Sequence, residues 1–335
     1  MRVKILIATL DTEYARLLSD YISEHHNDTI EVSVCSTLES TQEFVSKRRY
    51  DVALMDMMLI ENADTSAIHL PLLLWPENET HAKIPAVFGK IHKYRRVSTI
   101  VATILERYAK VSGNRHGPEI KNANITAVWS PAGGVGKTTV ALAYAVSTNP
   151  EDKEVFYLNL EAFSSVPGYF SENGKSISSV FEMLDNSNGN VKMLVQGICC
   201  RENGIKYLTS PDNYDDMCIL SAANIKELVT SCAELADELV IDLSCACDSR
   251  TRQVFDIADK VLIVTSSVIS AETKLAQFMS QNNVFESIKD KTTIVANKGA
   301  KVNEQFSETM ISLPYIQSND ATEIYRILSE NSFRS

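Results

Sequence analysis

The chain has 335 residues and is 44% hydrophobic, which suits two folded domains and excludes an intrinsically disordered protein. Its charge is uneven: residues 1–118 hold 14 basic and 15 acidic residues, whereas residues 119–335 hold 18 and 28. Because excess negative charge repels the phosphates of DNA, the second part is not expected to bind a specific nucleic acid.

The sequence gives no sign of a membrane span or of export. No apolar run approaches the roughly 20 residues that a membrane span needs, so we expect no transmembrane segment. The first residues reach Asp11 too soon for a secretory signal peptide. Seven cysteines, an odd number in a chain of this length, do not form a disulfide framework pattern. We therefore expect a cytoplasmic protein.

Short apolar segments alternate with helical patterns over the first 111 residues. Strands are expected at residues 2–8, 30–35, 50–56, 70–74 and 86–88, and helices at 12–25, 38–48 and 96–110. Strands that alternate with helices indicate an α/β domain built on a doubly wound parallel sheet.

Residues 1–111 resemble the receiver domain of two-component signalling. Asp56, after the third strand, matches the phosphoacceptor of that family, and Lys90 matches the lysine that pairs with the phosphoryl group. Two acids that bind Mg²⁺ in receivers are replaced by Thr9 and Leu10, which leaves Mg²⁺ with too few oxygen ligands. We expect an atypical receiver-like domain that serves as a docking module, with Asp56 as an acid at a strand end.

Two polar segments close this part of the chain. Residues 90–96 are the most basic segment and are expected to form a solvated loop, the alternative being contact with an anionic partner or a lipid surface. Residues 112–121 have the glycine, proline and polar content of a linker. The second domain is therefore expected to cover residues 122–335.

A phosphate-binding loop is predicted at residues 130–139, between an apolar strand at 125–129 and a helical pattern at 138–146. Its glycines let the backbone turn tightly around an anion, and the start of the helix adds a positive dipole end. The residues expected to contact ATP are Gly133, Gly134, Val135, Gly136, Lys137, Thr138 and Thr139. Lys137 would reach the β- and γ-phosphates, and the Thr138 hydroxyl would bind Mg²⁺.

The loop resembles the deviant Walker loop of ParA/MinD ATPases. Pro131 occupies the position of the first glycine of the ordinary motif, whereas residues 133–138 match the family ending GGxGKT. In that family a lysine before the two glycines crosses a dimer interface to the partner's nucleotide, and here Ala132 takes its place. The resemblance thus implies the fold and ATP binding more firmly than the nucleotide-dependent homodimer.

Acidic residues after two later strands extend the resemblance. Residues 237–244 look like a Walker B strand, which implies that Asp242 serves the Mg²⁺ ion and catalysis. The strand at 154–160 leads to Asn159 and Glu161, where the family carries two acids. The second acid of the family helps to position the attacking water, which implies a catalytic role for Glu161 beside Lys137.

Further segments match the same family in order. Residues 255–265 resemble its next strand, and residues 292–298 end a strand in Asn297, which is expected at the adenine edge because an amide offers both a donor and an acceptor. The receiver-like start and the strand and proline loop at 204–211 are similar to the TadZ/CpaE branch, which places pilus or secretion machinery. Residues 321–334 lack the basic amphipathic face that anchors MinD to membranes.

The resemblance implies a slow ATPase that acts as a localisation or assembly factor with protein partners of a pilus or secretion machine. It would be recruited through them to a cell pole or the inner face of the membrane. Three alternatives stay open: a non-hydrolysing dimerisation module, a chromosome or septum positioning ATPase, and a metal-inserting chaperone. The last would use Cys245 and Cys247, which supply two ligands and would need Cys199 and Cys200 or a dimer to complete a site.

Overall fold

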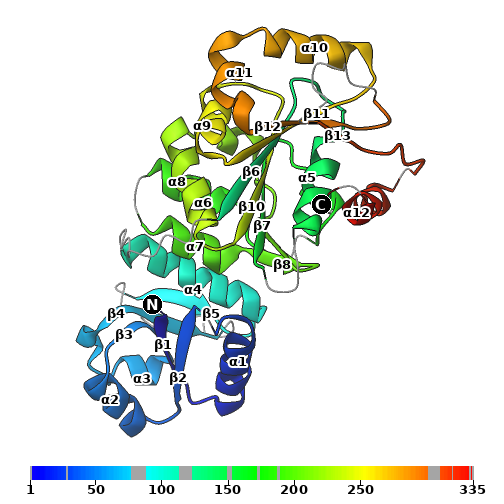
Figure 1. Cartoon of the computed structure of the whole chain (residues 1–335). Coiled ribbons are helices and arrows are strands. Elements are labelled where there is room, and N and C mark those ends of the chain that lie inside the picture. Colours follow the sequence, from blue (N-terminus) through cyan, green and yellow to red (C-terminus); the bar gives the residue numbers. More distant parts are fainter. Residues whose placement is uncertain are drawn as a thin grey trace. The chain divides into compact units, whose positions relative to one another are not determined.

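The computed structural model describes residues 2–27, 29–76, 88–112, 123–148, 153–171, 174–186, 189–300, 310–318, 320–331 and 333. The chain divides into two compact units, Met1–Gly113 and Asn114–Ser335, each with its own sheet (Figure 1). Most of the predicted linker lies outside the described residues, so the exact domain limits remain a prediction.

The first unit is a five-stranded parallel sheet with helices between the strands. Its strands are β1 (Val3–Ala8), β2 (Ile30–Cys35), β3 (Tyr50–Met55), β4 (Ile68–Trp75) and β5 (Gly89–His92). Its helices are α1 (Thr12–His25), α2 (Leu38–Lys47), α3 (Met57–Ile60) and α4 (Val97–Ser112). The strand order β2-β1-β3-β4-β5 is that of the flavodoxin-like doubly wound sheet, so the predicted fold class is confirmed.

Polar caps set where the first two helices begin. The Asp11 side chain accepts a hydrogen bond from the Tyr14 backbone N–H at the start of α1. Thr37 and Ser40 exchange side-chain and backbone hydrogen bonds in a capping box at the start of α2. Such caps satisfy backbone donors that a helix leaves unpaired in its first turn.

The fifth strand of the first unit begins later than the sequence predicted. The prediction at 86–88 is wrong in register, because β5 pairs with β4 from Gly89 onward; residues 86 and 87 lie outside the described residues. Lys90 lies within this strand, with its Nζ atom 4.7 Å from the centre of the Trp75 ring. The first part of the basic segment is therefore a strand, whereas residues 94–96 form an exposed turn, as predicted. Lys93, only 7% exposed, lies at the carboxyl edge of the sheet, where the sequence had placed Lys90.

The second unit is built on an eight-stranded sheet in the order β13-β12-β11-β6-β10-β7-β9-β8. The strands are β6 (Asn124–Trp129), β7 (Val155–Leu160), β8 (Cys200–Glu202), β9 (Ile205–Tyr207), β10 (Glu238–Leu243), β11 (Lys260–Thr265), β12 (Thr292–Ala296) and β13 (Met310–Ser312). All described pairs are parallel except the edge pair of β8 and β9. The predicted doubly wound class is therefore confirmed, with one antiparallel strand at the edge.

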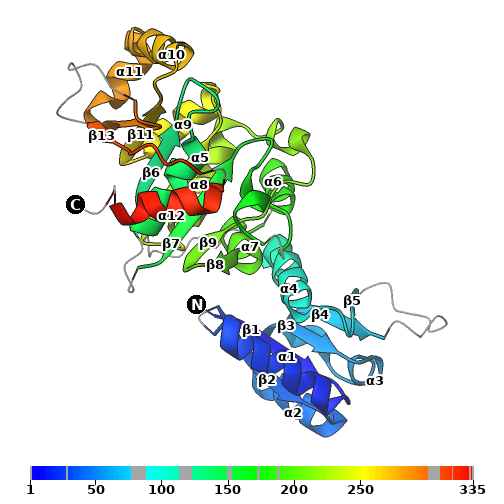
Figure 2. The same ribbon diagram turned by 90° about the vertical axis from the view of Figure 1, so that its right-hand side faces the viewer.

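Helices cover both faces of this sheet. They are α5 (Lys137–Ser147), α6 (Ser178–Asp185), α7 (Val191–Ile198), α8 (Ala222–Ala233), α9 (Ser249–Ile257), α10 (Ile269–Met279), α11 (Asn282–Ile288) and α12 (Ala321–Asn331). Figure 1 shows α5 and α12 on one face and α8 and α9 on the other, and Figure 2 shows α12 lying against α5. Tyr325 and Leu328 of α12 are buried in the core that α5 shares, so this helix packs on the domain itself.

The sheet brings the predicted site residues to one edge. β6 and β11 are neighbours whose outgoing connections run in opposite directions, from β6 to β7 and from β11 to β12, so the loop after β6 occupies a topological switch point. Ligands of open α/β sheets bind at such points, outside the carboxyl ends of the strands. Asp242 lies near the carboxyl end of β10, the strand next to β6, and Glu161 directly follows β7, the strand beyond β10. Across the described ranges, no helix has the length and apolar character to cross a membrane.

Candidate functional site

The Asp56 carboxylate of the first unit is fully engaged by its own chain. Oδ1 lies 2.5 Å from Nζ of Lys93, and Oδ2 accepts hydrogen bonds from the Thr9 hydroxyl at 2.6 Å and the Leu10 N–H at 2.8 Å. Lys93 also donates to the Thr9 hydroxyl at 3.1 Å. The sequence assigned the pairing lysine to Lys90, which is wrong because the register of β5 delivers Lys93 instead.

This geometry predicts that Asp56 does not accept a phosphoryl group from acetyl phosphate. Receivers bind Mg²⁺ with two acids at this edge of the sheet, whereas here Thr9 and Leu10 take those positions and donate hydrogen bonds to one Asp56 oxygen. Intact-mass measurement after incubation with acetyl phosphate and Mg²⁺ should show no added phosphoryl group. An addition that disappears in Asp56→Asn would contradict the prediction and make this unit a phosphorylation switch.

Local backbone conformation forms the phosphate loop of the second unit. The buried Ser130 hydroxyl accepts a hydrogen bond from the Ala132 N–H at 3.1 Å and turns the chain out of β6. Gly134 and Gly136 have φ values of 72° and 92°, which favour glycine. A Cβ atom on Gly136 would lie 2.4 Å from the Asn297 amide nitrogen, so a larger residue does not fit there. Gly136 directly precedes α5, whose free N–H groups then face the loop.

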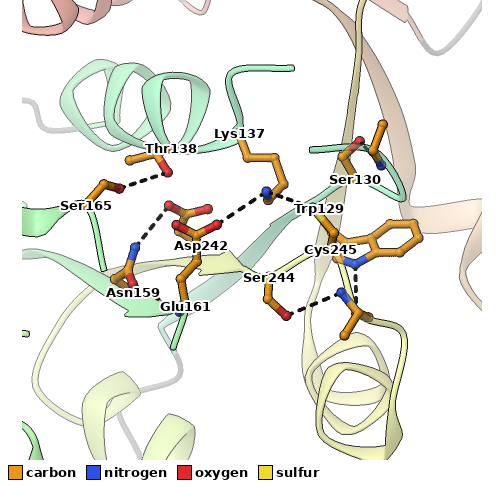
Figure 3. A network of polar contacts seen from close by, with 12 residues as sticks. Trp129, Ser130, Lys137, Thr138, Asn159, Glu161, Ser165, Asp242, Ser244 and Cys245 are labelled. Carbon is orange, nitrogen blue, oxygen red and sulfur yellow. Dashed lines mark hydrogen bonds and ion pairs between the residues drawn. The ribbon is translucent and has the colours of Figure 1, made fainter. Parts of the chain in front are cut away.

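Lys137 is held inside the loop by two neighbours. Its side chain is 7% exposed, and Nζ lies 3.4 Å from Oε1 of Glu161 and 3.4 Å from Sγ of Cys245 (Figure 3). Burial alone would lower the pKa of Lys137, but Glu161, Cys245 and Asp242 outweigh it and raise that pKa above its ordinary value. Lys137 therefore keeps its positive charge at the place where phosphates would bind.

Asp242 is a buried carboxylate with one oxygen left without a hydrogen bond. Its Oδ2 accepts from the Tyr157 hydroxyl at 2.9 Å and from the Asn159 amide at 3.2 Å. Its Oδ1 is buried and has no hydrogen-bond partner among the described residues. Burial, together with the charge of Glu161, raises the pKa of Asp242 to about 7, although Thr138, Tyr157 and Lys137 act in the opposite direction. A buried carboxylate oxygen without a hydrogen-bond partner is suited to bind a cation.

The residues present fit a Mg²⁺ ion. Figure 3 shows the Thr138 side chain of α5 close to Asp242 of β10, and the Thr138 hydroxyl accepts a hydrogen bond from the Ser165 hydroxyl at 3.4 Å. Oxygen ligands are those that Mg²⁺ prefers, and it usually binds few protein groups and keeps several waters. The free Asp242 oxygen and the Thr138 hydroxyl are thus suited to hold the ion directly or through its waters.

Thr139 and Asn297, which were also predicted to contact ATP, form hydrogen bonds within the protein. Thr139 shares a hydrogen bond with the Tyr169 hydroxyl at 3.3 Å, so its side chain faces the loop after β7. The Asn297 amide donates to the Val135 carbonyl at 2.9 Å, and Nζ of Lys298 donates to the Gly134 carbonyl at 2.8 Å. Asn297 therefore braces the phosphate loop; its expected contact with adenine stays a prediction.

Sequence reasoning missed three residues that complete the site. Tyr157 lies two positions before Asn159, so both side chains point to the same face of β7. The alternation of side chains along a strand could therefore have identified Tyr157 from the sequence. Cys245 was considered for metal, yet its sulfur contacts Lys137. Lys298 has a φ of 56°, which no residue pattern indicated.

The cysteines do not assemble into a metal site in the described part of the chain. None of the seven cysteines, all of which lie in described residues, forms a disulfide, and the described residues contain no group of three or more His, Cys, Asp or Glu side chains arranged to hold a metal ion. The backbone carbonyl of Ala246, between Cys245 and Cys247, instead accepts hydrogen bonds from Trp129 Nε1 at 3.1 Å and from the Thr251 hydroxyl at 2.9 Å. The alternative in which a dimer completes the ligand set stays a prediction.

The loop, the buried lysine and the acidic strand ends define a P-loop nucleotide-binding fold. More particularly, the chain is similar in fold to a ParA family ATPase from Chlorobium tepidum TLS, which aligns with 63% of this chain and 96% of its own length, at 16% identity and a TM-score of 0.52. The septum site-determining protein MinD from Pyrococcus horikoshii OT3, complexed with Mg-ADP, aligns with 63% of this chain and 91% of its own length, at 14% identity and a TM-score of 0.47. No protein-family model and no curated protein matches the chain.

Proposed function

We propose that the second unit binds ATP with Mg²⁺ and hydrolyses it slowly. The observation that carries this proposal is the buried Lys137 ammonium inside a glycine loop, with the Asp242 carboxylate and its unpaired oxygen on a nearby strand. A buried cation beside a helix start suits the β- and γ-phosphates. The likeness in fold to a ParA family ATPase supports the same reading.

In this proposal each residue has a separate task. The loop N–H groups and Lys137 bind the phosphates and stabilise the charge that develops on the transferred group. Thr138 and Asp242 would hold Mg²⁺, which supplies positive charge to the phosphate oxygens when bound. Glu161 must leave Lys137 as the phosphates arrive, and its carboxylate then orients the attacking water. Turnover is expected below the median of about 10 s⁻¹ for enzymes, because Asn159 stands where the family has the first of its two acids.

Phosphate release by the full-length chain with ATP and Mg²⁺ tests this function. We expect slow release that requires Mg²⁺ and stops in Lys137→Ala. Tight binding without any release above that variant would favour the alternative of a non-hydrolysing module that uses ATP only to set its assembly state. Absence of both binding and release would remove the proposal.

Glu161→Gln is predicted to bind ATP more tightly and to hydrolyse it more slowly. In the free chain the Glu161 carboxylate lies 3.4 Å from Nζ of Lys137, where it competes with an incoming phosphate. Removing its charge removes that competition, which we expect to strengthen binding about tenfold, since one charge-assisted contact is involved. Calorimetry and phosphate release on the same variant measure both effects. Weaker binding together with faster release would contradict the assignment.

We further propose that the chain serves as a localisation or assembly factor for a pilus or secretion machine, as in the TadZ/CpaE branch. A flavodoxin-like unit preceding a ParA/MinD-type fold supports this reading, and the occupied Asp56 suits a docking unit more than a phosphorylation switch. A fluorescent fusion in the host cell should form a polar or membrane-associated focus that depends on the machine's other proteins. A focus that follows the nucleoid or the division septum would favour the positioning alternatives.

The homodimer is predicted to be nearly insensitive to the nucleotide. Ala132, 4% exposed, carries no charge to a partner's phosphates, so ATP and ADP should give similar monomer–dimer constants. In Ala132→Lys the added ammonium should favour the ATP dimer about tenfold, the worth of one charge-assisted hydrogen bond. Sedimentation of both chains with each nucleotide measures this. A wild-type dimer that forms only with ATP would show that another cation has replaced the missing lysine.

A further inference from the structure

A basic groove lies at the amino edge of the first sheet, opposite the edge that carries Asp56. It holds about 380 Å³ of space and is lined by Lys4, Glu31, Ser33, Lys47, Arg48, Arg49 and Tyr50. These residues come from the starts of β1, β2 and β3 and from the end of α2. Because all strands of this sheet are parallel, Tyr50 and Asp56 mark opposite ends of β3.

The groove concentrates positive charge in a region that is otherwise nearly neutral. Four of its residues are basic and one is acidic, whereas residues 1–118 hold 14 basic and 15 acidic residues in all. Lys47 pairs with Glu43 at 2.5 Å, and Arg48 reaches Glu31 only at 4.0 Å. The side chains of Lys4 and Arg49 form no ion pair with any described residue. At least two cations are therefore available to a ligand.

Tyr50 lines the groove, but its hydroxyl is enclosed by the protein. The residue is 4% exposed, and within the described ranges its hydroxyl has no hydrogen-bond partner. A buried hydroxyl without a partner costs free energy, and most native structures avoid it. Ser33, half-buried in the same groove, offers a hydroxyl.

We propose that this groove binds a small phosphorylated metabolite of the size of a nucleotide. Guanidinium and ammonium groups together suit phosphate oxygens, and arginine can bind them through two parallel hydrogen bonds. The volume falls within the range of small-molecule sites, about 300–1,000 Å³. A concave site favours such a ligand over a lipid surface, which would need cations spread on a convex face.

The consequence is that the first unit takes its input at the edge opposite to the receiver's usual site. Asp56 is closed by Lys93, Thr9 and Leu10, so the edge used for phosphorylation in receivers offers no free carboxylate. The amino edge offers unpaired cations. Ligand binding there would act on this unit without any covalent change.

The test uses the full-length chain carrying Lys137→Ala, so that the phosphate loop does not contribute. Calorimetry at low ionic strength with inorganic pyrophosphate, and separately with ADP, should show saturable binding. Arg49→Gln and Lys4→Gln should each weaken it at least about tenfold, since each removes one charge-assisted contact. The matched control is Arg16→Gln on α1, where Arg16 pairs with Asp20 at 3.4 Å, and it should bind like the parent.

Three results would overturn the inference. One is the absence of saturable binding by either probe, and another is equal binding by Arg49→Gln and the Arg16→Gln control. The third is binding to vesicles with anionic lipids that pyrophosphate does not displace, which would assign the groove to a membrane surface. The same three substitutions in the chain with Lys137 intact should leave MgATP binding unchanged, which separates this inference from the proposed ATPase.

Discussion

Lys137→Ala is expected to weaken MgATP binding at least about 100-fold and to abolish hydrolysis. Nζ of Lys137 is the cation inside the glycine loop, and its exposed fraction of 7% places it in a dry site where charge interacts strongly. Hydrogen bonds to charged groups contribute roughly 1.5–3 kcal/mol each, and the lysine would reach two phosphates. A loss of about 2.7 kcal/mol corresponds to 100-fold in affinity.

The matched control for this variant is Lys298→Ala. Lys298 also carries an ammonium to the loop, but it donates to the Gly134 carbonyl from an exposed position. We expect it to change affinity by less than about tenfold, because exposed charges contribute little. Calorimetry with ATP and Mg²⁺ compares the two, and circular dichroism verifies that each remains folded. Equal losses in both variants would mean that general charge near the loop, and not the buried lysine, binds the phosphates.

The sequence predicted the positions of the strands more completely than the contacts between side chains. Buried parallel strands appear as continuous apolar runs, so β1, β3, β6 and β10 were placed within two residues of their observed limits. The short strands β8 and β13, three residues each, carry too little pattern to be recognised. The error in β5 arose for the same reason, since one three-residue shift exchanged Lys90 for Lys93 at the sheet edge.

The phosphate loop and the acidic residues of the site could be identified from the sequence, because each of them comes at the end of an apolar strand. What these residues do in the absence of nucleotide was not predictable. The contact of Lys137 with Glu161 and Cys245 depends on the strand order β6-β10-β7, which brings together segments far apart in the sequence. The unpaired Asp242 oxygen likewise results from packing, because Tyr157 and Asn159 both bind the other oxygen.

Asp242→Asn is expected to stabilise the nucleotide-free chain at pH 8 while removing the effect of Mg²⁺ on ATP binding. Burial raises the pKa of Asp242 from 3.8 to about 7. Between these two values the folded chain holds a proton that the unfolded chain has lost, so the stability of the wild type falls as pH rises from about 4 to about 7. The amide of the variant does not titrate and escapes this loss.

The pH dependence of the difference distinguishes this cause from a packing effect. Each pH unit between the two pKa values is worth about 1.4 kcal/mol, so the advantage of Asp242→Asn should grow by about 2–3 kcal/mol from pH 5 to pH 8. Urea unfolding of the wild type and of Asp242→Asn at each pH measures this difference in stability. The contributions of the other acidic residues are the same in both chains and cancel in the difference. Adding ATP and Mg²⁺ at pH 8 should reverse the order, because the ligand stabilises only the chain whose carboxylate can serve the ion. An advantage equal at both pH values would show that Asp242 is already paired in the folded protein, and its assignment to Mg²⁺ would then lose its physical basis.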